Sequence, residues 1–205
     1  YLTDTGRPIY EPPSGPVPEF AYATGLWWWF LARRFYPLAR GEASGLREKF
    51  IPNQRLVYMS TCVLMAIWLI FTYLFFFGDE KWTYLGITLF WALPAILPQF
   101  LFGADILWHH RKLVFWAILV PGTYLSLMDI VALSETTWSI SKSQTTGVLF
   151  FGILPLEEVV FFFITNVLIT FGMTLLLANV SQERFVELKQ AFARWRNHGR
   201  ETETI

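Results

Sequence analysis

The sequence predicts an all-α integral membrane protein with about four transmembrane helices and an N-terminal Trp-rich segment that is interfacial or membrane-inserted. Hydrophobic residues make up 54% of the chain and charged residues 16%, whereas charged residues make up roughly 25% of a typical soluble protein. The chain also contains four apolar runs long enough to span a bilayer. Its formal net charge is zero, so we expect no nucleic-acid partner.

Residues 1–55 are expected to form a Pro-rich arm, a Trp-rich anchor and a basic segment. Residues 1–18 are rich in Pro and Gly and predict an irregular arm. Residues 20–32 are apolar, but as a helix they reach only about 20 Å, short of the roughly 30 Å hydrocarbon core. Three consecutive Trp residues followed by Arg33 and Arg34 favour an interfacial anchor, and a fifth span over residues 20–36 is the alternative.

Residues 56–180 are expected to form a four-helix transmembrane domain. The apolar runs cover residues 57–77, 82–104, 113–134 and about 147–179. Pro94 and Pro98 predict a kink in the second run. Glu157 and Glu158 interrupt the fourth run near its start. Residues 181–205 predict a charged, amphipathic, cytoplasmic tail.

The distribution of Lys and Arg predicts the orientation of the spans. With four spans, the segments on one side carry 13 of these residues and the loops on the other side carry 2. Cytoplasmic loops are enriched in Lys and Arg. We therefore expect a multi-pass integral membrane protein with both termini in the cytoplasm.

Three acidic residues are predicted to lie at one depth, on the side away from the cytoplasm. Asp129 lies five residues before the end of the third run, and Glu157 and Glu158 lie at the start of the fourth. An acidic residue at mid-membrane costs about 2.5–3.5 kcal/mol on insertion scales and less near the edge. Three acids in one place therefore suggest a functional site.

Structural explanations for these acids compete with the functional one. Pro155 suits a first helical position, which places Glu157 and Glu158 in a first turn that favours negative charge, among lipid headgroups. Asp129 lies inside a span and has no such explanation. Its structural alternative is a hydrogen bond between helices, to Thr165 or Asn166.

The functional interpretation is acid–base chemistry in an apolar site. Desolvation and a neighbouring carboxylate both raise the pKa of a carboxyl group. A neutral carboxyl can donate a proton to an apolar substrate, and an ionised one can take a proton back. Aromatic rings can stabilise a passing cation, although Phe-rich spans usually only pack or face lipid. The aromatic residues near the acids are Trp138, Phe150, Phe151, Phe161, Phe162 and Phe163.

The stretch from residue 82 to residue 171 resembles the membrane-embedded lycopene cyclase domain of fungi, archaea and some bacteria. The matching segments are WTYLGITLFWALP, VPGTYLSLMDIVALSETTWSIS and TTGVLFFGILPLEEVVFFFITNVLITFG. Pro-Leu-Glu-Glu followed by a Phe cluster is the most specific piece. The resemblance implies cofactor-free, proton-initiated cyclisation of lycopene-type end groups in carotenoid biosynthesis, with lycopene and the lipid bilayer as partners.

By this resemblance, Glu157, Glu158 and Asp129 are the catalytic candidates, and which one donates the proton stays open. The substrate-binding candidates are Trp138, Pro155, Phe161, Phe162, Phe163 and Asn166. No cofactor is expected. No metal site is expected either, because Asp105 and His109 at a four-residue spacing are too few ligands.

The family usually supplies two copies of a three-helix repeat, and this chain resembles the second copy. A partner chain with the other repeat, a homodimer or a larger membrane complex is therefore expected to complete the site. The alternative function is a non-catalytic carotenoid- or pigment-binding subunit, or a structural subunit, of a larger membrane complex such as a photosynthetic one. A transporter fits less well, since the acids lie near one face only.

Overall fold

The computed structural model describes residues 17–36, 50–135, 140 and 142–202, and most of them are helical. The helices are α1 (Val17–Arg34), α2 (Gln54–Phe77), α3 (Thr83–His109), α4 (Arg111–Ser134), α5 (Leu156–Leu177) and α6 (Asn179–Thr202). Short 3₁₀ turns cover Glu80–Trp82 and Lys142–Gln144. Strands β1 (Leu149–Phe150) and β2 (Leu154–Pro155) pair in an antiparallel hairpin. Helices α2 to α5 are long and apolar enough to cross a membrane, which confirms the fold class predicted from the sequence.

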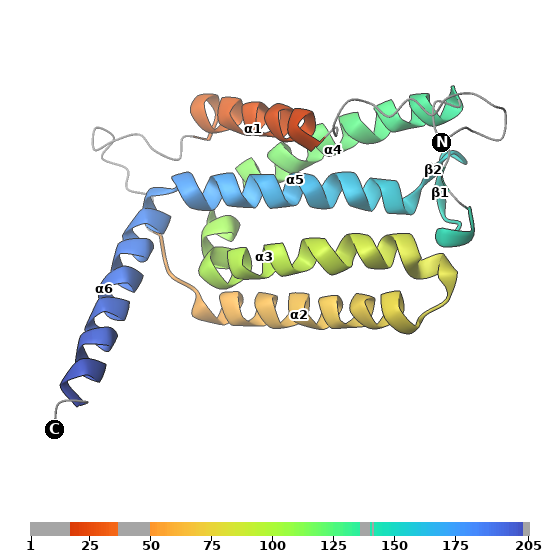
Figure 1. Cartoon of the computed structure of the whole chain (residues 1–205). Coiled ribbons are helices and arrows are strands. Elements are labelled where there is room, and N and C mark those ends of the chain that lie inside the picture. The colour runs from red at the N-terminus through yellow and green to blue at the C-terminus, as the bar shows by residue number, and fades with distance from the viewer. Residues whose placement is uncertain (1–16, 37–49, 136–139, 141, 203–205) are drawn as a thin grey trace.

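The helices α2, α3 and α5 lie side by side, and α4 and α1 lie on the other side of α5 (Figure 1). One face of α3, including Leu85, Leu89 and Leu93, is buried between α2 and α5. On the opposite side, Trp28 of α1 packs with Leu113 of α4. Because α5 contacts α1, α3 and α4, it is the central helix of the bundle.

Glycines allow close contact between helices. A Cβ atom at Gly86 would lie 2.9 Å from the Cβ of Phe75, so α2 and α3 approach closely there. A Cβ atom at Gly122 of α4 would lie 3.1 Å from the ring of Phe163 on α5. Such small residues are typical of membrane helix interfaces, where lipid supplies no hydrophobic force between helices and close packing takes its place.

The backbone of α3 departs from helical geometry at Gly103, five residues after the second of the two prolines at which a kink was predicted. Pro94 and Pro98 are inside the helix, and the non-helical backbone is at Gly103, with φ −165° and ψ 44°. Ring closure at proline removes one backbone donor, which a membrane helix tolerates. A Cβ atom at Gly103 would lie 2.7 Å from a side-chain methyl group of Leu175, so α3 packs closely against α5 at this bend.

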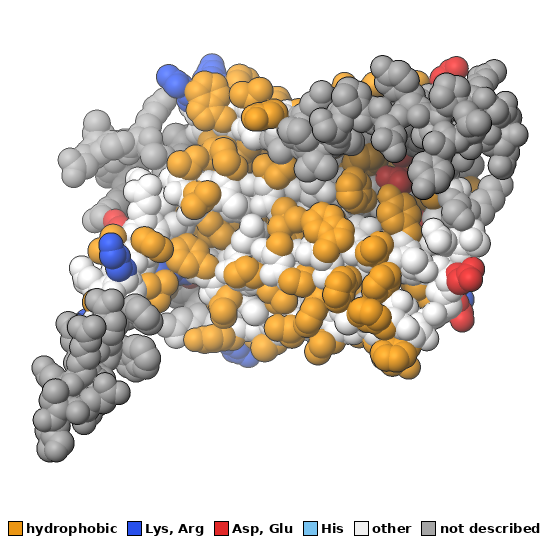
Figure 2. Space-filling model, in the orientation of Figure 1, with side chains coloured by type: hydrophobic (Ala, Val, Ile, Leu, Met, Phe, Trp, Pro, Cys, Tyr) orange, Lys and Arg blue, Asp and Glu red, His pale blue; other side chains and the backbone are white. Residues whose placement is uncertain are grey.

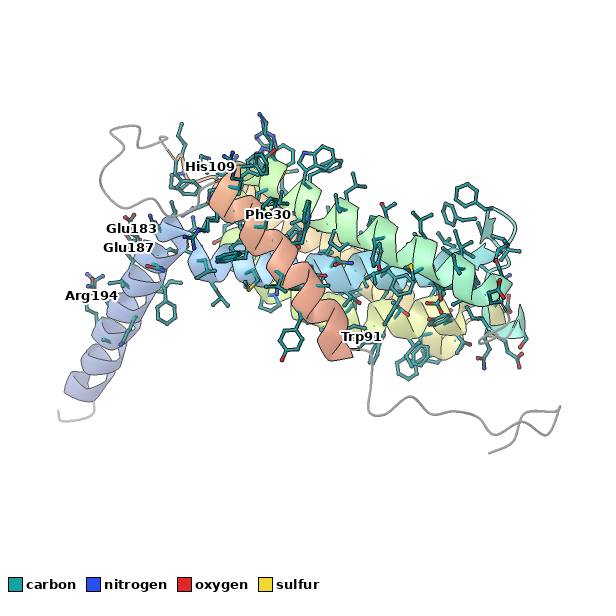
Figure 3. All side chains as sticks on the ribbon, turned by 90° about the horizontal axis from the view of Figure 1, so that it is seen from above. Phe30, Trp91, His109, Glu183, Glu187 and Arg194 are labelled. Carbon is teal, nitrogen blue, oxygen red and sulfur yellow. The ribbon has the colours of Figure 1, made fainter. Side chains whose placement is uncertain are left out.

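A clasp formed by Asp105 and Arg184 joins α6 to this bend of α3. The two guanidinium nitrogens of Arg184 donate to the two carboxylate oxygens of Asp105, at 2.9 and 2.7 Å. Arg184 also donates to the carbonyl oxygen of Phe102 at 2.7 Å, and the backbone N–H of Asn53 donates to Asp105. The clasp therefore fixes the start of α6, which then leaves the bundle carrying Glu183, Glu187 and Arg194 (Figure 3).

The flank of the bundle is covered by apolar side chains, and charged side chains gather toward its two ends (Figure 2). On α2, the exposed residues include Met59, Leu69, Phe76 and the single cysteine, Cys62. An apolar surface of this extent suits contact with lipid.

Candidate active site

The β1–β2 hairpin positions the paired glutamates at the start of α5. Phe151 and Gly152 turn the hairpin with φ values of 53° and 72°, a left-handed conformation that glycine adopts easily. The N–H of Leu156 donates to the carbonyl oxygen of Val148 at 2.9 Å and closes the hairpin against the helix. Apolar residues that the sequence assigned to the fourth apolar run thus form a hairpin before the helix begins.

Pro155 is the residue immediately before α5, one position earlier than the first helical position predicted from the sequence. Its φ of −59° suits the entry to a helix. Glu157 and Glu158 lie in the first turn, as predicted. There the unpaired N–H groups of the helix favour negative charge.

Glu157 is completely buried, with an exposed fraction of 0%. The backbone N–H and the hydroxyl of Thr146 both donate to its Oε1, at 2.6 and 2.7 Å. Its Oε2 is buried and has no hydrogen-bond partner among the described residues. This position argues against the headgroup interpretation for Glu157, because the side chain points into the protein.

Glu158 is half-buried and faces α3. The hydroxyl of Tyr84, in the first turn of α3, donates to its Oε1 at 2.6 Å. This hydrogen bond joins residues 74 positions apart in the chain. Glu157 and Glu158 are neighbours on one helix turn, yet they are held by different elements.

Asp129 completes the acidic cluster from α4. Its exposed fraction is 3%. It lies within electrostatic range of both Tyr84 and Glu158, as Glu157 does. The structure thus brings together the three acids that the sequence predicted at one depth. Among the described residues, no group of three or more His, Cys, Asp or Glu side chains has a metal-binding arrangement.

The structural interpretation of Asp129 predicted a hydrogen bond to Thr165 or Asn166, but the side chains of both residues bond to other groups. Thr165 donates to the carbonyl oxygen of Phe161 in its own helix. The amide oxygen of Asn166 accepts from the hydroxyl of Thr24 in α1, and its amide nitrogen donates to the carbonyl oxygen of Phe162. Asn166 is 1% exposed and joins α1 to α5, more than two helical turns beyond the glutamates.

The aromatic candidates differ in their surroundings. Phe162 is buried, and its ring meets that of Phe161 edge to face at 5.7 Å. Phe163 packs on Gly122 of α4. Phe150 and Phe151 of the hairpin are exposed, and the exposed fraction of Phe151 is 83%. In the part of the chain that the structure describes, these two rings therefore do not cover the acids. Trp138 lies outside the described residues.

Tyr84 and Thr146 were missed in the sequence. Tyr84 lies in the segment WTYLG, at the start of the second apolar run. A hydroxyl group at that position is the feature from which its role could have been predicted. Thr146 belongs to a polar loop of Ser, Thr and Gln residues, any of which can donate a hydrogen bond. Nothing local marks which hydroxyl meets a carboxyl group.

The fold and the site define a helical membrane protein with carboxyl groups buried at one end of its bundle. Comparison with known proteins relates part of it to the lycopene cyclases. The chain is 38% identical over 92 residues to a lycopene beta-cyclase of Halobacterium salinarum, which covers 45% of this chain and 38% of that protein. It is 42% identical over 92 residues to a bifunctional lycopene cyclase/phytoene synthase of Podospora anserina, covering 44% of this chain and 16% of that protein.

A third relative extends the similarity. A bifunctional lycopene cyclase/phytoene synthase of Colletotrichum graminicola is 35% identical over 115 residues, which covers 56% of this chain and 19% of that protein. No protein-family model matches the chain, and no solved structure matches it. The resemblance to lycopene cyclases predicted from the sequence is confirmed over about half of the chain, and the chain spans less than half the length of these relatives.

Proposed function

We propose that this chain takes part in carotenoid biosynthesis as a lycopene cyclase, closing the end groups of lycopene into rings. The observation that carries the proposal is the cluster of Glu157, Glu158 and Asp129 at one end of an apolar helix bundle. Acidic residues in membrane spans are costly, so three of them in one place favour a functional site. The named relatives are cyclases, so the alternative of a non-catalytic pigment-binding or structural subunit is not favoured.

The reaction requires one proton to be added and one to be removed. A carboxylic acid protonates the terminal double bond of the end group and leaves a tertiary cation. A neighbouring double bond attacks the cation, which closes the ring and moves the positive charge along the chain. A carboxylate then takes a proton from a carbon beside the new cation. The product is an isomer of the substrate, because one proton is added and one is removed. The carboxyl groups of this chain supply the acid and the base.

The apolar flank and the Phe cluster suit a hydrocarbon substrate. Lycopene dissolves in the bilayer, and a site at the membrane edge of the bundle is reached laterally from the lipid. Phe161 and Phe163 follow the paired glutamates in α5 and are half-buried. We propose that these two rings and Pro155 contact the end group. Ring faces stabilise a cation by about 0.5–2 kcal/mol each. Phe162 and Asn166 are occupied in packing, and Trp138 stays a prediction.

We also propose that the chain contributes one repeat of a larger site. Phe150 and Phe151 belong to the hairpin that precedes the paired glutamates, and they give the acidic end of the bundle an exposed aromatic surface. A second cyclase-like repeat, in another chain, another copy or a further segment, would cover it. If the second repeat belongs to a separate chain, the assembly is either a homodimer or a larger membrane complex.

The proposed topology is multi-pass, with the acidic end away from the cytoplasm. The basic segments and the C-terminal tail lie on the cytoplasmic side, as the distribution of Lys and Arg indicates. For the N-terminus we revise the expectation. Helix α1 runs parallel to α5, since Thr24 meets Asn166 and Trp28 meets Thr174. Its first residue is therefore directed toward the acidic end.

Expression in a lycopene-producing bacterial host, followed by pigment chromatography, tests the function. We expect monocyclic or bicyclic carotenes, either from this chain alone or when it is co-expressed with the remaining part of the Halobacterium salinarum cyclase. Glu157→Gln and Glu158→Gln should each lower cyclisation by about 10²–10⁴-fold. The control Glu135→Gln changes an exposed carboxyl group and should leave cyclisation unchanged. Unaltered lycopene in both expression formats, with the protein in the membrane, would refute the proposal.

A further inference from the structure

We propose that Glu157 is the proton donor of the reaction and Glu158 the proton acceptor, with Tyr84 as the residue that positions Glu158. This division rests on the proposed function and goes further, since it assigns opposite tasks to two adjacent and chemically identical residues. Three observations carry it: the hydrogen bonds of Glu157, those of Glu158, and the different elements that hold them.

The hydrogen bonds of Glu157 match a protonated carboxyl group. Both donors of Thr146 meet Oε1, which accepts them as a carbonyl oxygen with two lone pairs does. The other oxygen, Oε2, is buried without a partner among the described residues. As part of an ionised carboxylate this buried oxygen would carry negative charge with no donor facing it, which is costly. As the hydroxyl of the neutral acid it carries the proton that the substrate receives.

The hydrogen bond of Glu158 matches a carboxylate. The Tyr84 hydroxyl donates to its Oε1, and a donated hydrogen bond supports the ionised form of a carboxyl group. Glu158 is half-buried, so its charge is less confined than that of Glu157. Its second oxygen remains available to take a proton.

The two carboxyl groups point in different directions. Adjacent residues of an α-helix are turned by about 100° about the helix axis. Thr146 of the loop before the hairpin holds Glu157, and Tyr84 of α3 holds Glu158. In the proposed division, Glu157 adds a proton to the substrate and Glu158 removes one from the cation. After each turnover Glu157 is ionised and Glu158 protonated, and transfer of one proton between them, directly or through solvent, restores the starting state.

Deuterium incorporation separates the two tasks. Membranes containing the protein are given unlabelled lycopene in heavy-water buffer, and the carotenoids are analysed by mass spectrometry. With the original chain, each closed ring should contain one deuterium atom. Glu157→Gln should give neither rings nor deuterium, because no proton is added. Glu158→Gln should still protonate lycopene. The cation then returns to deuterated lycopene or loses a proton elsewhere and gives a changed ratio of ring isomers.

Tyr84→Phe should behave like a weaker form of Glu158→Gln, with the rate of ring formation lowered roughly 10-fold by loss of one hydrogen bond to a charged group. Deuterium should still enter the carotenoid. Tyr73→Phe is the matched control, because Tyr73 is exposed on α2, and it should change nothing. A purely structural role of Tyr84 would lower all signals together and leave the isomer ratio unchanged.

Two results would overturn the assignment while the proposed function stands: deuterium in carotenoids from Glu157→Gln membranes, or none from both Glu158→Gln and Tyr84→Phe membranes, with the original chain active. Absence of rings and of deuterium with the original chain and its completing repeat would instead overturn the proposed function itself. The level of each variant in the membrane is measured by immunoblot.

Discussion

At the scale of single residues, the acidic cluster shows what a sequence can and cannot reveal. The positions of Asp129, Glu157 and Glu158 were predictable, because an acid in an apolar run is conspicuous and topology fixes its depth. Their partners were not predictable. The hydroxyl groups of Tyr84 and Thr146 reach the glutamates only because α3 and a polar loop meet the start of α5. That meeting depends on packing between segments, which no local pattern encodes.

The hydroxyl of Thr146 offers a prediction at this scale. Thr146→Val keeps the shape of the side chain and removes one of the two hydrogen bonds to Glu157 Oε1. We expect a loss of about 1–2 kcal/mol in the free energy of unfolding, measured by thermal unfolding in detergent. Thr146→Ser retains the hydroxyl and serves as the control. Equal stability of the Val and Ser variants would contradict the importance of this contact.

At the scale of helices, hydropathy predicted the first three spans to within five residues of their observed ends, because length and apolarity are properties of the chain itself. The fourth helix begins nine residues after the start of its predicted run. The hairpin before α5 was missed, since its residues are as apolar as those of the helix. For α1, the sequence favoured an interfacial anchor and kept a fifth span over residues 20–36 only as the alternative, because the apolar segment looked too short to span the bilayer. In the structure Trp28 is 1% exposed, and its indole N–H donates to the hydroxyl of Thr174 at 2.9 Å.

Adjacent tryptophans of α1 give a matched test of its packing. Trp28→Phe removes a buried hydrogen bond and part of a buried ring. Trp29→Phe changes a neighbour that is 50% exposed. We expect Trp28→Phe to lower the free energy of unfolding by about 1–3 kcal/mol and Trp29→Phe to have little effect. If both variants unfold at the same temperature in detergent, α1 is not an integral part of the bundle.

At the scale of the whole molecule, the bundle has two chemically different ends. Arg33, Arg34, Arg111 and Lys112 belong to helix ends on the side predicted to be cytoplasmic, and the paired glutamates lie at the other end. Net charge alone, which is zero, conceals this polarity. The Lys and Arg residues at one end are the feature from which the orientation of such a protein is predicted.

Cysteine labelling tests this arrangement. In a Cys62→Ser background, single cysteines are introduced at position 17 in α1 and at position 189 in α6, and intact cells and inverted vesicles are treated with a membrane-impermeant maleimide. We expect position 17 to react in intact cells and position 189 in inverted vesicles. Reaction of both only in inverted vesicles would restore the two cytoplasmic termini expected from the sequence.

The clasp between Asp105 and Arg184 has a consequence for synthesis. The two residues are 79 positions apart, and the carboxylate is made first. Until translation reaches Arg184, the bend of α3 holds an acid, 5% exposed in the finished bundle, without its cation. A chain that ends before α6 therefore lacks the cation that pairs with Asp105, and the carboxyl group keeps only its backbone donors, the N–H groups of Asn53 and Ile106. The bend of α3 is thus completed only after helices α2 to α5 have been synthesised.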